Sequence, residues 1–259
     1  MRRLDHLAGF DDLSGAWCNA DPVTSSVMEA ISFVTPVLEN FFIHTVAESM
    51  PGKQEPELHR RCRSFMFEES THTREHKKFN AALLGYLCRP PPGSALLQTF
   101  MTGAKKHVTL SCRLLYVVAL EHFAAVLSKR YLTLHGDWKF RSSYAKELFE
   151  QHAREEMGHR SVVFDLWAAK ESTGRVGRAL AIMSIMLAGA AYLSVAVPWI
   201  LHRKNENRWS GTAGALAAHA MKSHPIDNGV VMLRELFSFA CRDFHPDRSG
   251  GAQLAGDLK

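Results

Sequence analysis

Two segments of the sequence place carboxylates and imidazoles at helical spacing. Glu69, His72 and His76 lie three and four residues apart in "FMFEESTHTREHKKFN", and Glu156 and His159 repeat the Glu-x-x-His spacing in "QHAREEMGHRSVVFD". Residues three or four apart share one face of an α-helix, so each pair directs a carboxylate and an imidazole the same way. Either pair alone is weak evidence, because an ordinary solvated helix face is the alternative.

The surroundings of both pairs favour burial. Phenylalanines flank the first pair, and an apolar run follows the second, while Glu39 in "PVLENFFI" and Glu121 in "VVALEHFAAVL" sit alone among apolar residues. Several carboxylates that converge in an apolar core are costly to bury unless a cation compensates them. The order Glu, Glu-x-x-His, Glu, Glu-x-x-His on four helices is the ligand order of dinuclear carboxylate bundles. The sequence therefore predicts a dinuclear metal centre.

The elements that must position these residues are helices. Ala, Leu, Glu, Lys, Arg and Met are frequent between Pro and Gly clusters, and alternation of β-branched residues is scarce, so we predict an all-α fold. The four expected helices cover about 22–50, with a break at Pro36, and about 55–86, 94–134 and 142–172. The expected fold is a ferritin-like four-helix bundle with additional C-terminal helices. Its parts are an N-terminal segment (1–20), the dinuclear-metal bundle (21–173), further helices that include an apolar helix 179–201 (174–245), and a flexible tail (246–259).

Composition narrows the classes of function. A chain of 259 residues that is 46% hydrophobic can form one large domain. Its net charge of +5 is dispersed, without the basic runs interleaved with aromatics that favour nucleic-acid binding. The five cysteines are far apart and form no Cys-x-x-Cys pair, which argues against disulfides and thiolate zinc sites. The N-terminus lacks the apolar core of a signal peptide. We expect a cytoplasmic protein that does not bind nucleic acid.

One later segment is long enough to cross a bilayer. "ALAIMSIMLAGAAYLSVAVPWIL", Ala179 to Leu201, is an uncharged run of about 23 residues. Its Ala, Gly and Ser content equally suits a helix packed against the bundle or against a second subunit. We expect a buried or interfacial helix, with monotopic, peripheral membrane contact through 179–201 as the alternative. A homodimer is left open.

The quoted segments, together with the late "FHPD", resemble the bacterial family named predicted metal-dependent hydrolase over about Asn19 to Asp247. The resemblance implies a ferritin-like bundle with a metal site. The metal ligands that it implies are Glu39, Glu69, His72, Glu121, Glu156 and His159, with His76 and His152 as further candidates. Where this family typically has Gln before the motif glutamate, the chain has Glu68, which would orient a ligand or replace one.

The donor types indicate which metal and which reaction to expect. Carboxylates and imidazoles without thiolates suit iron, or alternatively manganese, so we expect two iron ions. His152 precedes Glu156 by four residues, and the resulting His-x-x-x-Glu-x-x-His resembles the histidine-enriched variant of ferritin-like arylamine N-oxygenases. For His76 and His152, an exposed or merely supporting histidine is the alternative. We expect a di-iron enzyme that activates O2 to oxidise or oxygenate a small, partly hydrophobic organic substrate.

Two other functions remain open at this stage. A metal-dependent hydrolase would use the paired metals to generate hydroxide and polarise a substrate oxygen, as the family name proposes. A ferroxidase or iron-binding protein is the third function. No catalytic residue beyond the metal ligands, and no site for an organic cofactor, is evident.

Several neighbouring residues have weaker assignments. Asp165 either orients a ligand imidazole or is a surface carboxylate, and His122 is expected in the core or at its rim. Glu75 and Glu155 are expected to face solvent. The substrate opening is expected at the end of the bundle near His76 and His152, where Phe79, Leu83, Leu148 and Phe149 would provide an apolar lining.

Overall fold

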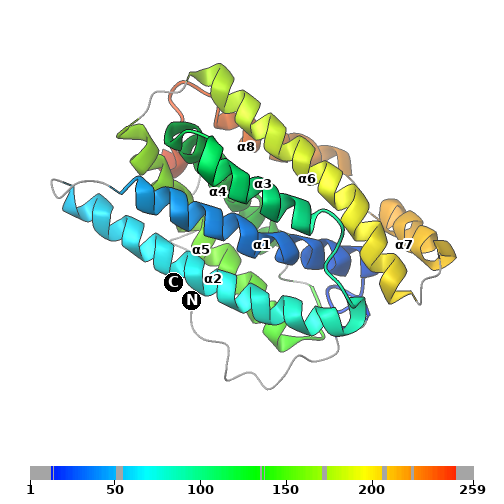
Figure 1. The fold of residues 1–259 in the computed structure, drawn as a ribbon. Helices are drawn as coiled ribbons and strands as arrows, with labels where there is room; N and C mark the ends of the chain where they lie inside the picture. Colours follow the sequence, from blue (N-terminus) through cyan, green and yellow to red (C-terminus); the bar gives the residue numbers. More distant parts are fainter. Residues whose placement is uncertain are drawn as a thin grey trace.

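A computed structural model describes residues 13, 15–50, 55–134, 136, 138–170, 174–205, 209–222 and 225–248 (Figure 1). The described residues form helices and contain no strand, which confirms the all-α prediction. The helices are α1 (Pro22–Glu48), α2 (Pro56–Leu87), α3 (Ser94–His107), α4 (Leu110–Leu134), α5 (Ser143–Ala168), α6 (Arg175–Lys204), α7 (Trp209–Lys222) and α8 (Pro225–Ser238), and a 3-10 turn η2 (Pro246–Arg248) follows.

Four of these helices form a bundle. Helix α1 packs on α2, α2 on α5, α5 on α4 and α4 on α1, which closes a ring. Helices α3 and α6 lie against the outside of this ring, α8 contacts α4 and α6, and α7 contacts α1 and α6. Each bundle helix contributes at least one residue of the predicted metal site.

The core consists of two apolar clusters with a polar layer between them. One cluster includes Phe65 of α2 and Trp167 of α5, and the other includes Phe79 of α2 and Leu148 of α5. Along both helices the acidic and histidine residues lie between these positions. The two clusters occur in opposite order along α2 and α5, so these helices run antiparallel. The polar layer is therefore enclosed by apolar packing along the bundle axis.

Local sequence signals explain several helix ends. The Asp21 carboxylate accepts hydrogen bonds from the amides of Val23 and Thr24, at 3.4 and 3.0 Å, and thereby caps α1. Cys88 ends α2 in a left-handed conformation (φ 63°), and after Arg89 comes a run of three prolines that cannot continue the helix. The Ser142 hydroxyl caps α5 by accepting from the Ala145 amide at 3.2 Å.

The predicted break at Pro36 is wrong, because α1 is continuous through this residue. Proline has no amide hydrogen, so the carbonyl of Ser32, one turn earlier, loses its helical partner. The side-chain amide of Asn80 on α2 donates to this carbonyl at 2.8 Å. A side chain of the neighbouring helix thus replaces the missing bond, and the helix does not need to end.

The single helix predicted over 94–134 is also wrong, because two helices cover this range. Helix α3 ends at His107, where Val108 is extended (φ −99°, ψ 136°), and α4 restarts at Leu110. The Thr109 hydroxyl accepts from the Cys112 amide at 3.4 Å, as a helix cap does. The break lets α3 lie outside the bundle while α4 enters it.

The remaining predicted boundaries are close to the observed ones. The helix expected over 142–172 ends at Ala168. Most of the N-terminal segment and of the tail expected to be flexible lies outside the described residues.

Three helices are apolar and long enough to cross a membrane: α1, residues 110–133 of α4, and α6. In α1 and α4, 56% of the most apolar window is buried, because both helices belong to the bundle. In α6 the window has the highest mean hydropathy, 2.1, yet only 22% of it is buried. Packing within the chain therefore covers only part of the apolar segment 179–201. The expectation of a buried or interfacial helix, with membrane contact as the alternative, stays a prediction.

Candidate metal centre

Helices α2 and α5 bring the two Glu-x-x-His pairs together. Glu69, His72, Glu156 and His159 are buried, and each offers a donor atom within 4.8 Å of the donors of the other three. His159 Nδ1 lies 2.7 Å from Glu69 Oε1 and 3.5 Å from Glu156 Oε1. His72 Nδ1 lies 3.5 Å from Glu69 Oε1 and 3.8 Å from Glu156 Oε1. The two imidazoles therefore direct the same ring nitrogen, Nδ1, toward the carboxylates.

A second cluster adjoins the first. Donor atoms of Glu39 on α1, His76 on α2 and His152 on α5 also lie within 4.8 Å of one another. His152 joins the two clusters, because its Nε2 is 3.2 Å from Glu156 Oε1 and its Nδ1 is 3.1 Å from His76 Nε2. Of the seven residues in both clusters, only His152 is partly exposed, with 18% of its side chain accessible.

Glu121 on α4 belongs to neither cluster, although it is fully buried. Neither of its carboxylate oxygens has a hydrogen-bond partner among the described residues. Burial, reinforced by the charges of Glu156 and Glu69, raises the pKa of Glu121 well above its ordinary value. Its assignment as a metal ligand stays a prediction.

Two outer carboxylates set the tautomers of the inner imidazoles. His72 Nε2 lies 2.7 Å from Glu155 Oε2, and His159 Nε2 lies 2.8 Å from Glu68 Oε2. A carboxylate only accepts hydrogen bonds, so Nε2 carries the hydrogen in both rings and the Nδ1 lone pair is available for a metal. Glu68 thus orients a histidine, one of the two roles predicted for it. The prediction that Glu155 faces solvent is wrong, because Glu155 orients His72.

In the metal-free protein, protons on two imidazoles take the place of a metal cation. Burial disfavours a charge on His72, but its hydrogen bonds to Glu155 and Glu69 raise its pKa to about 10. Burial opposes the charge on His159 as well, and the hydrogen bonds of this imidazole to Glu156, Glu68 and Glu69 raise its pKa well above its ordinary value. Without a metal, both imidazoles therefore carry a positive charge at neutral pH.

A chain of hydrogen bonds fixes His76 in a different tautomer. Asn80 donates through Nδ2 to the Ser32 carbonyl, so its Oδ1 accepts from the Ser32 hydroxyl at 2.7 Å. Ser32 Oγ then accepts from His76 Nδ1 at 2.8 Å, which leaves the lone pair on Nε2. Burial, together with the nearby charges of His152 and His72, lowers the pKa of His76 well below its ordinary value. His76 is therefore a neutral imidazole whose Nε2 lone pair faces His152 in the second cluster.

The residues present fit a pair of divalent cations. Glu39, Glu69, Glu121 and Glu156 place four carboxylates in the bundle core, against two protonated imidazoles. Oxygens without a hydrogen-bond partner occur on all four carboxylates, including both of Glu121 and Oε2 of Glu69. Unpartnered buried carboxylate oxygens are costly, and two divalent ions would supply four positive charges to match them. The cluster is a dinuclear-type metal site of buried histidine and glutamate residues.

The other neighbouring residues have structural contacts. Glu75, predicted to face solvent, is fully buried and accepts a hydrogen bond from the Tyr144 hydroxyl at 2.9 Å, so that prediction is wrong. Asp165 contacts Arg61 at 2.6 Å and His245 at 3.3 Å, and so binds none of the cluster imidazoles. His122 is buried with Nε2 3.0 Å from a backbone carbonyl, which confirms its placement in the core.

The apolar end of the site is closed rather than open. Phe79, Leu83 and Leu148 are fully buried, and Phe149 is nearly so. Trp17 inserts among them, 5.6 Å from the Phe79 ring and 6.0 Å from the Phe149 ring. The four residues predicted to line a substrate opening therefore fill a core cluster instead. The sequence offered no spacing signal for Trp17, because it precedes the first helix.

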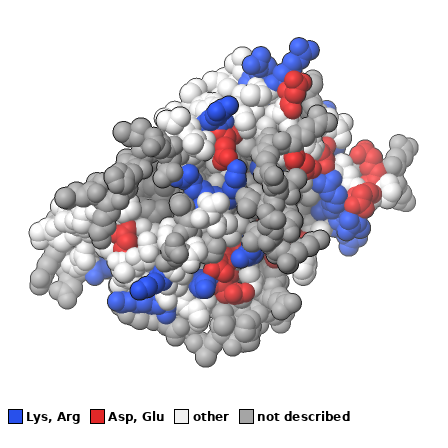
Figure 2. Space-filling model, turned by 180° about the vertical axis from the view of Figure 1, so that it is seen from behind, with Lys and Arg blue, Asp and Glu red and all other residues white. Residues whose placement is uncertain are grey.

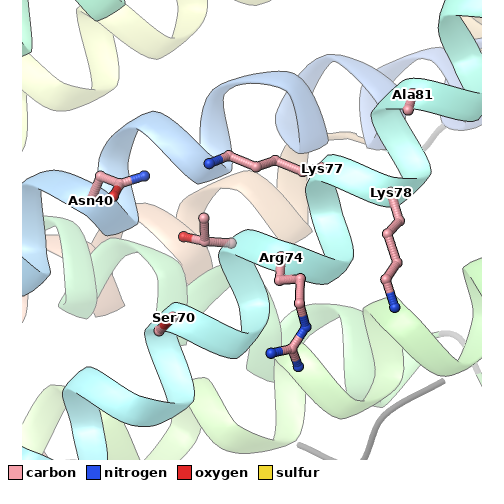
Figure 3. Close-up of a pocket in the computed structure, with 7 residues that line it drawn as sticks. Asn40, Ser70, Arg74, Lys77, Lys78 and Ala81 are labelled. Carbon is pink, nitrogen blue, oxygen red and sulfur yellow. The ribbon is translucent and has the colours of Figure 1, made fainter. Parts of the chain in front are cut away.

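A groove of about 600 Å³ lies between α1 and α2. Its lining residues are Asn40, Ser70, Thr73, Arg74, Lys77, Lys78 and Ala81. Lys77 extends toward α1, whereas Arg74 and Lys78 point the other way (Figure 3) and both contact Glu75. The Thr73 hydroxyl donates to Glu39 Oε2 at 2.7 Å, so a single side chain links the groove to the cluster.

The fold and the site together define an all-helical protein with a dinuclear-type metal site. The chain belongs to the family described as predicted metal-dependent hydrolase, whose model matches residues 2–250. No curated protein and no solved structure matches the chain.

Proposed function

We propose that this protein is a hydrolase that depends on two divalent metal ions. The observation that carries the proposal is the set of buried carboxylates with unpartnered oxygens, toward which two imidazoles direct their Nδ1 atoms. The family to which the chain belongs supports metal-dependent hydrolysis more directly than oxidation.

The ligands that we propose come from both clusters and from α4. Glu69, His72, Glu156 and His159 form the central set, to which Glu39, Glu121 and His76 add further donors. When bound, a pair of divalent ions lowers the pKa of a water molecule and polarises a substrate carbonyl or phosphoryl oxygen.

The chain's own residues hold the donors and handle protons. Glu155 and Glu68 keep the Nδ1 lone pairs of His72 and His159 directed inward. His152 is the candidate for proton transfer, because its two nitrogens contact Glu156 and His76 and its side chain is partly exposed. In our proposal His152 takes the proton that the attacking water loses and gives it to the leaving group of the substrate.

The groove between α1 and α2 is the proposed route for the substrate, since the apolar end is filled. Thr73 separates the groove from Glu39, and Lys77 lies along it (Figure 3). A cationic residue at this place favours an organic substrate that carries an acidic group. That the rest of the substrate is small and partly hydrophobic stays a prediction.

Oxidation by O2 at two iron ions is the second candidate function. Four carboxylates and several imidazoles, with no cysteine in either cluster, form a donor set that suits iron or manganese. The same donors would serve a hydrolytic pair of manganese ions. The metal therefore has to be determined together with the reaction.

The test combines metal analysis with an assay in the absence of oxygen. Elemental analysis of the purified protein should give about two iron or manganese ions per chain. The loaded protein should hydrolyse a panel of carboxylic and phosphoric esters and amides under anaerobic conditions, lose this activity to a chelator, and regain it when the metal is restored. Oxygen consumption without anaerobic hydrolysis would favour the oxidase instead.

Matched variants connect the result to the site. Glu156→Gln should remove most of the metal, whereas Glu57→Gln, on an exposed turn of the same bundle, should not change the metal content. Glu155→Gln should weaken metal binding about 10- to 100-fold, because Gln can present a donor to His72 Nε2. If Glu156→Gln and Glu155→Gln both bind metal as the original chain does, the proposed centre is wrong.

The cellular location stays part of the proposal. The five cysteines are all free in the described structure, which suits the reducing cytoplasm. The three long apolar helices are compatible with membrane association.

A further inference from the structure

The exposed apolar side chains of this protein are concentrated on three helices. Thirteen large hydrophobic residues are exposed in the described structure, and all but Phe67 and Tyr86 lie on α3, α6 or α8. Isolated apolar residues are normal on a protein surface, but a contiguous group marks an interaction surface.

Helix α6 forms the centre of this surface. Its exposed residues Val176, Leu180, Met183 and Leu187 follow one another at spacings of four, three and four, and therefore lie on one stripe. Their exposed fractions range from 43% to 73%. Further along the helix, Val195 is 54% exposed. A stripe of this kind on a globular protein requires a partner.

The flanking helices extend the same surface. Helix α3 adds Leu96 and Phe100, which are 73% and 65% exposed, and α8 adds four residues between Val230 and Phe237. Helix α6 contacts α8 directly, and the start of α3 lies against Tyr192 of α6. Figure 1 shows α6 along the outside of the bundle, with α3 on one side of it and α8 passing behind it. We refer to the exposed large hydrophobic residues of these three helices as the apolar face.

Charge distinguishes between the partners that could cover the apolar face. Helices α3 and α6 contain no Asp or Glu, and the Glu235 carboxylate of α8 is paired with Lys129 at 2.6 Å. Exposed cations lie at both ends: Lys106 and Arg175 where α3 ends and α6 begins, and Arg89 near Trp199 at the other end. In the view from behind Figure 1, Figure 2 shows acidic and basic side chains interspersed over the coloured part of the surface. A second copy would bring cations against cations, whereas anionic lipid headgroups complement them.

We infer that the apolar face docks the protein onto the surface of an anionic membrane, with α6 lying parallel to the membrane plane. A bilayer accepts an apolar stripe bordered by cations in this orientation, because the side chains enter the acyl boundary and the cations meet the headgroups.

The contacts of α6 argue against a spanning helix. Its inner face is held to the bundle by the Tyr116–Ser184 hydroxyl pair at 3.2 Å and by the bond from the Tyr192 hydroxyl to the Ala30 carbonyl at 2.9 Å. Near its end, Lys204 forms a buried ion pair with Glu29. Insertion of α6 across a bilayer would break all of these contacts, whereas docking in the plane of the membrane keeps them.

The experiment measures sedimentation of the full-length, metal-loaded protein with vesicles. Phosphatidylcholine vesicles are compared with vesicles that also contain phosphatidylglycerol. The double variant Leu180→Gln/Leu187→Gln should lower the partition coefficient at least about tenfold, since both leucines are exposed apolar side chains. Phe67→Gln is the matched control, because Phe67 is 70% exposed on α2, outside the apolar face. This control should bind as the original chain does.

A second pair of substitutions tests how much the cations contribute to membrane binding. Lys106→Gln/Arg175→Gln should reduce binding to phosphatidylglycerol vesicles by roughly thirtyfold and affect phosphatidylcholine vesicles much less. Unchanged metal content and melting temperature show that the variants are folded. The measurement needs no substrate. The membrane inference and the hydrolase proposal can therefore fail independently of each other.

Three outcomes would overturn the inference. One is equal binding by the leucine double variant and by the original chain, or no vesicle binding at all. Another is a dimer in light scattering that the leucine substitutions dissociate, because a second copy would then cover the apolar face. The third is a protein that detergent extracts from cell membranes but alkaline carbonate does not, because α6 would then span the bilayer.

Discussion

Metal removal should reverse the pH dependence of stability, and the protonation of His72 makes this prediction quantitative. In the metal-free protein the pKa of His72 is about 10, because its hydrogen bonds to Glu155 and Glu69 outweigh the effect of burial. An unfolded chain releases this proton near the ordinary value of 6.5. The folded metal-free chain therefore holds a proton that the unfolded chain has lost, throughout the interval between the two values.

The sign follows from the number of bound protons. A group whose folded pKa is raised stabilises the protein fully below its unfolded pKa, and this contribution disappears as the pH rises through the folded pKa. The raised pKa values of His159, Glu39 and Glu121 act in the same direction. The metal-free protein should therefore become less stable from neutral to alkaline pH.

The expected size can be worked out for His72 alone. One proton contributes about 1.4 kcal/mol per pH unit, so a rise from about pH 7 to about pH 9 should cost about 3 kcal/mol. For a chain of this length, that corresponds to a fall of roughly 6–12 °C in melting temperature. His159 adds to the fall in the same interval.

With metal bound, the dependence should have the opposite sign. Metal ligands bind as neutral imidazoles and ionised carboxylates, so binding releases protons and becomes tighter as the pH rises. Melting curves of the chelator-treated and the metal-loaded protein across this pH range would measure both slopes. His72→Gln should flatten the slope of the metal-free form, and His44→Gln, at an exposed position on α1, serves as the control. A melting temperature of the metal-free protein that stays constant or rises toward alkaline pH would refute the reasoning.

Three further substitutions test the packing around the site, each by thermal or urea denaturation. Asn80→Leu should lower the free energy of unfolding by about 1–3 kcal/mol, because the buried Ser32 carbonyl loses its donor. Trp17→Ala should cost about 3–5 kcal/mol, because the side chain is fully buried between aromatic rings. Lys204→Met should cost about 3–5 kcal/mol, because the buried Glu29 carboxylate loses its cation and keeps only the hydrogen bond from the Trp17 indole, and Glu29→Gln in the same chain should restore much of the loss.

The sequence was sufficient to predict that seven of the eight candidate ligands come together in the core, all except Glu121. Spacings of three and four follow from helix geometry alone, so Glu69 with His72 and Glu156 with His159 had to share a helix face. An isolated glutamate within an apolar helix is costly without a partner, which indicated Glu39 and Glu121. The structure brings Glu39 into a cluster with two histidines and buries Glu121 outside both clusters.

Residues that act across helices were harder to predict. Whether Glu155 or Glu75 faces solvent depends on the rotation of each helix within the bundle, and the sequence contains no signal for that rotation. Glu155 contacts His72 on another helix, and Glu75 contacts Tyr144. The opening was misplaced for a similar reason, because Trp17 comes from outside the four bundle helices and fills the apolar end.

Pro36 illustrates how a local rule can fail and still lead to the site. A proline inside a helix leaves one carbonyl without a partner, so the rule predicts an end or a kink. Here Asn80 donates to that carbonyl, and its other side-chain atom must then accept from the Ser32 hydroxyl. Ser32 in turn accepts from His76 and leaves the His76 Nε2 lone pair toward His152 in the second cluster. The carbonyl that Pro36 leaves without a helical partner is therefore the start of the chain of hydrogen bonds that orients His76 in the candidate metal centre.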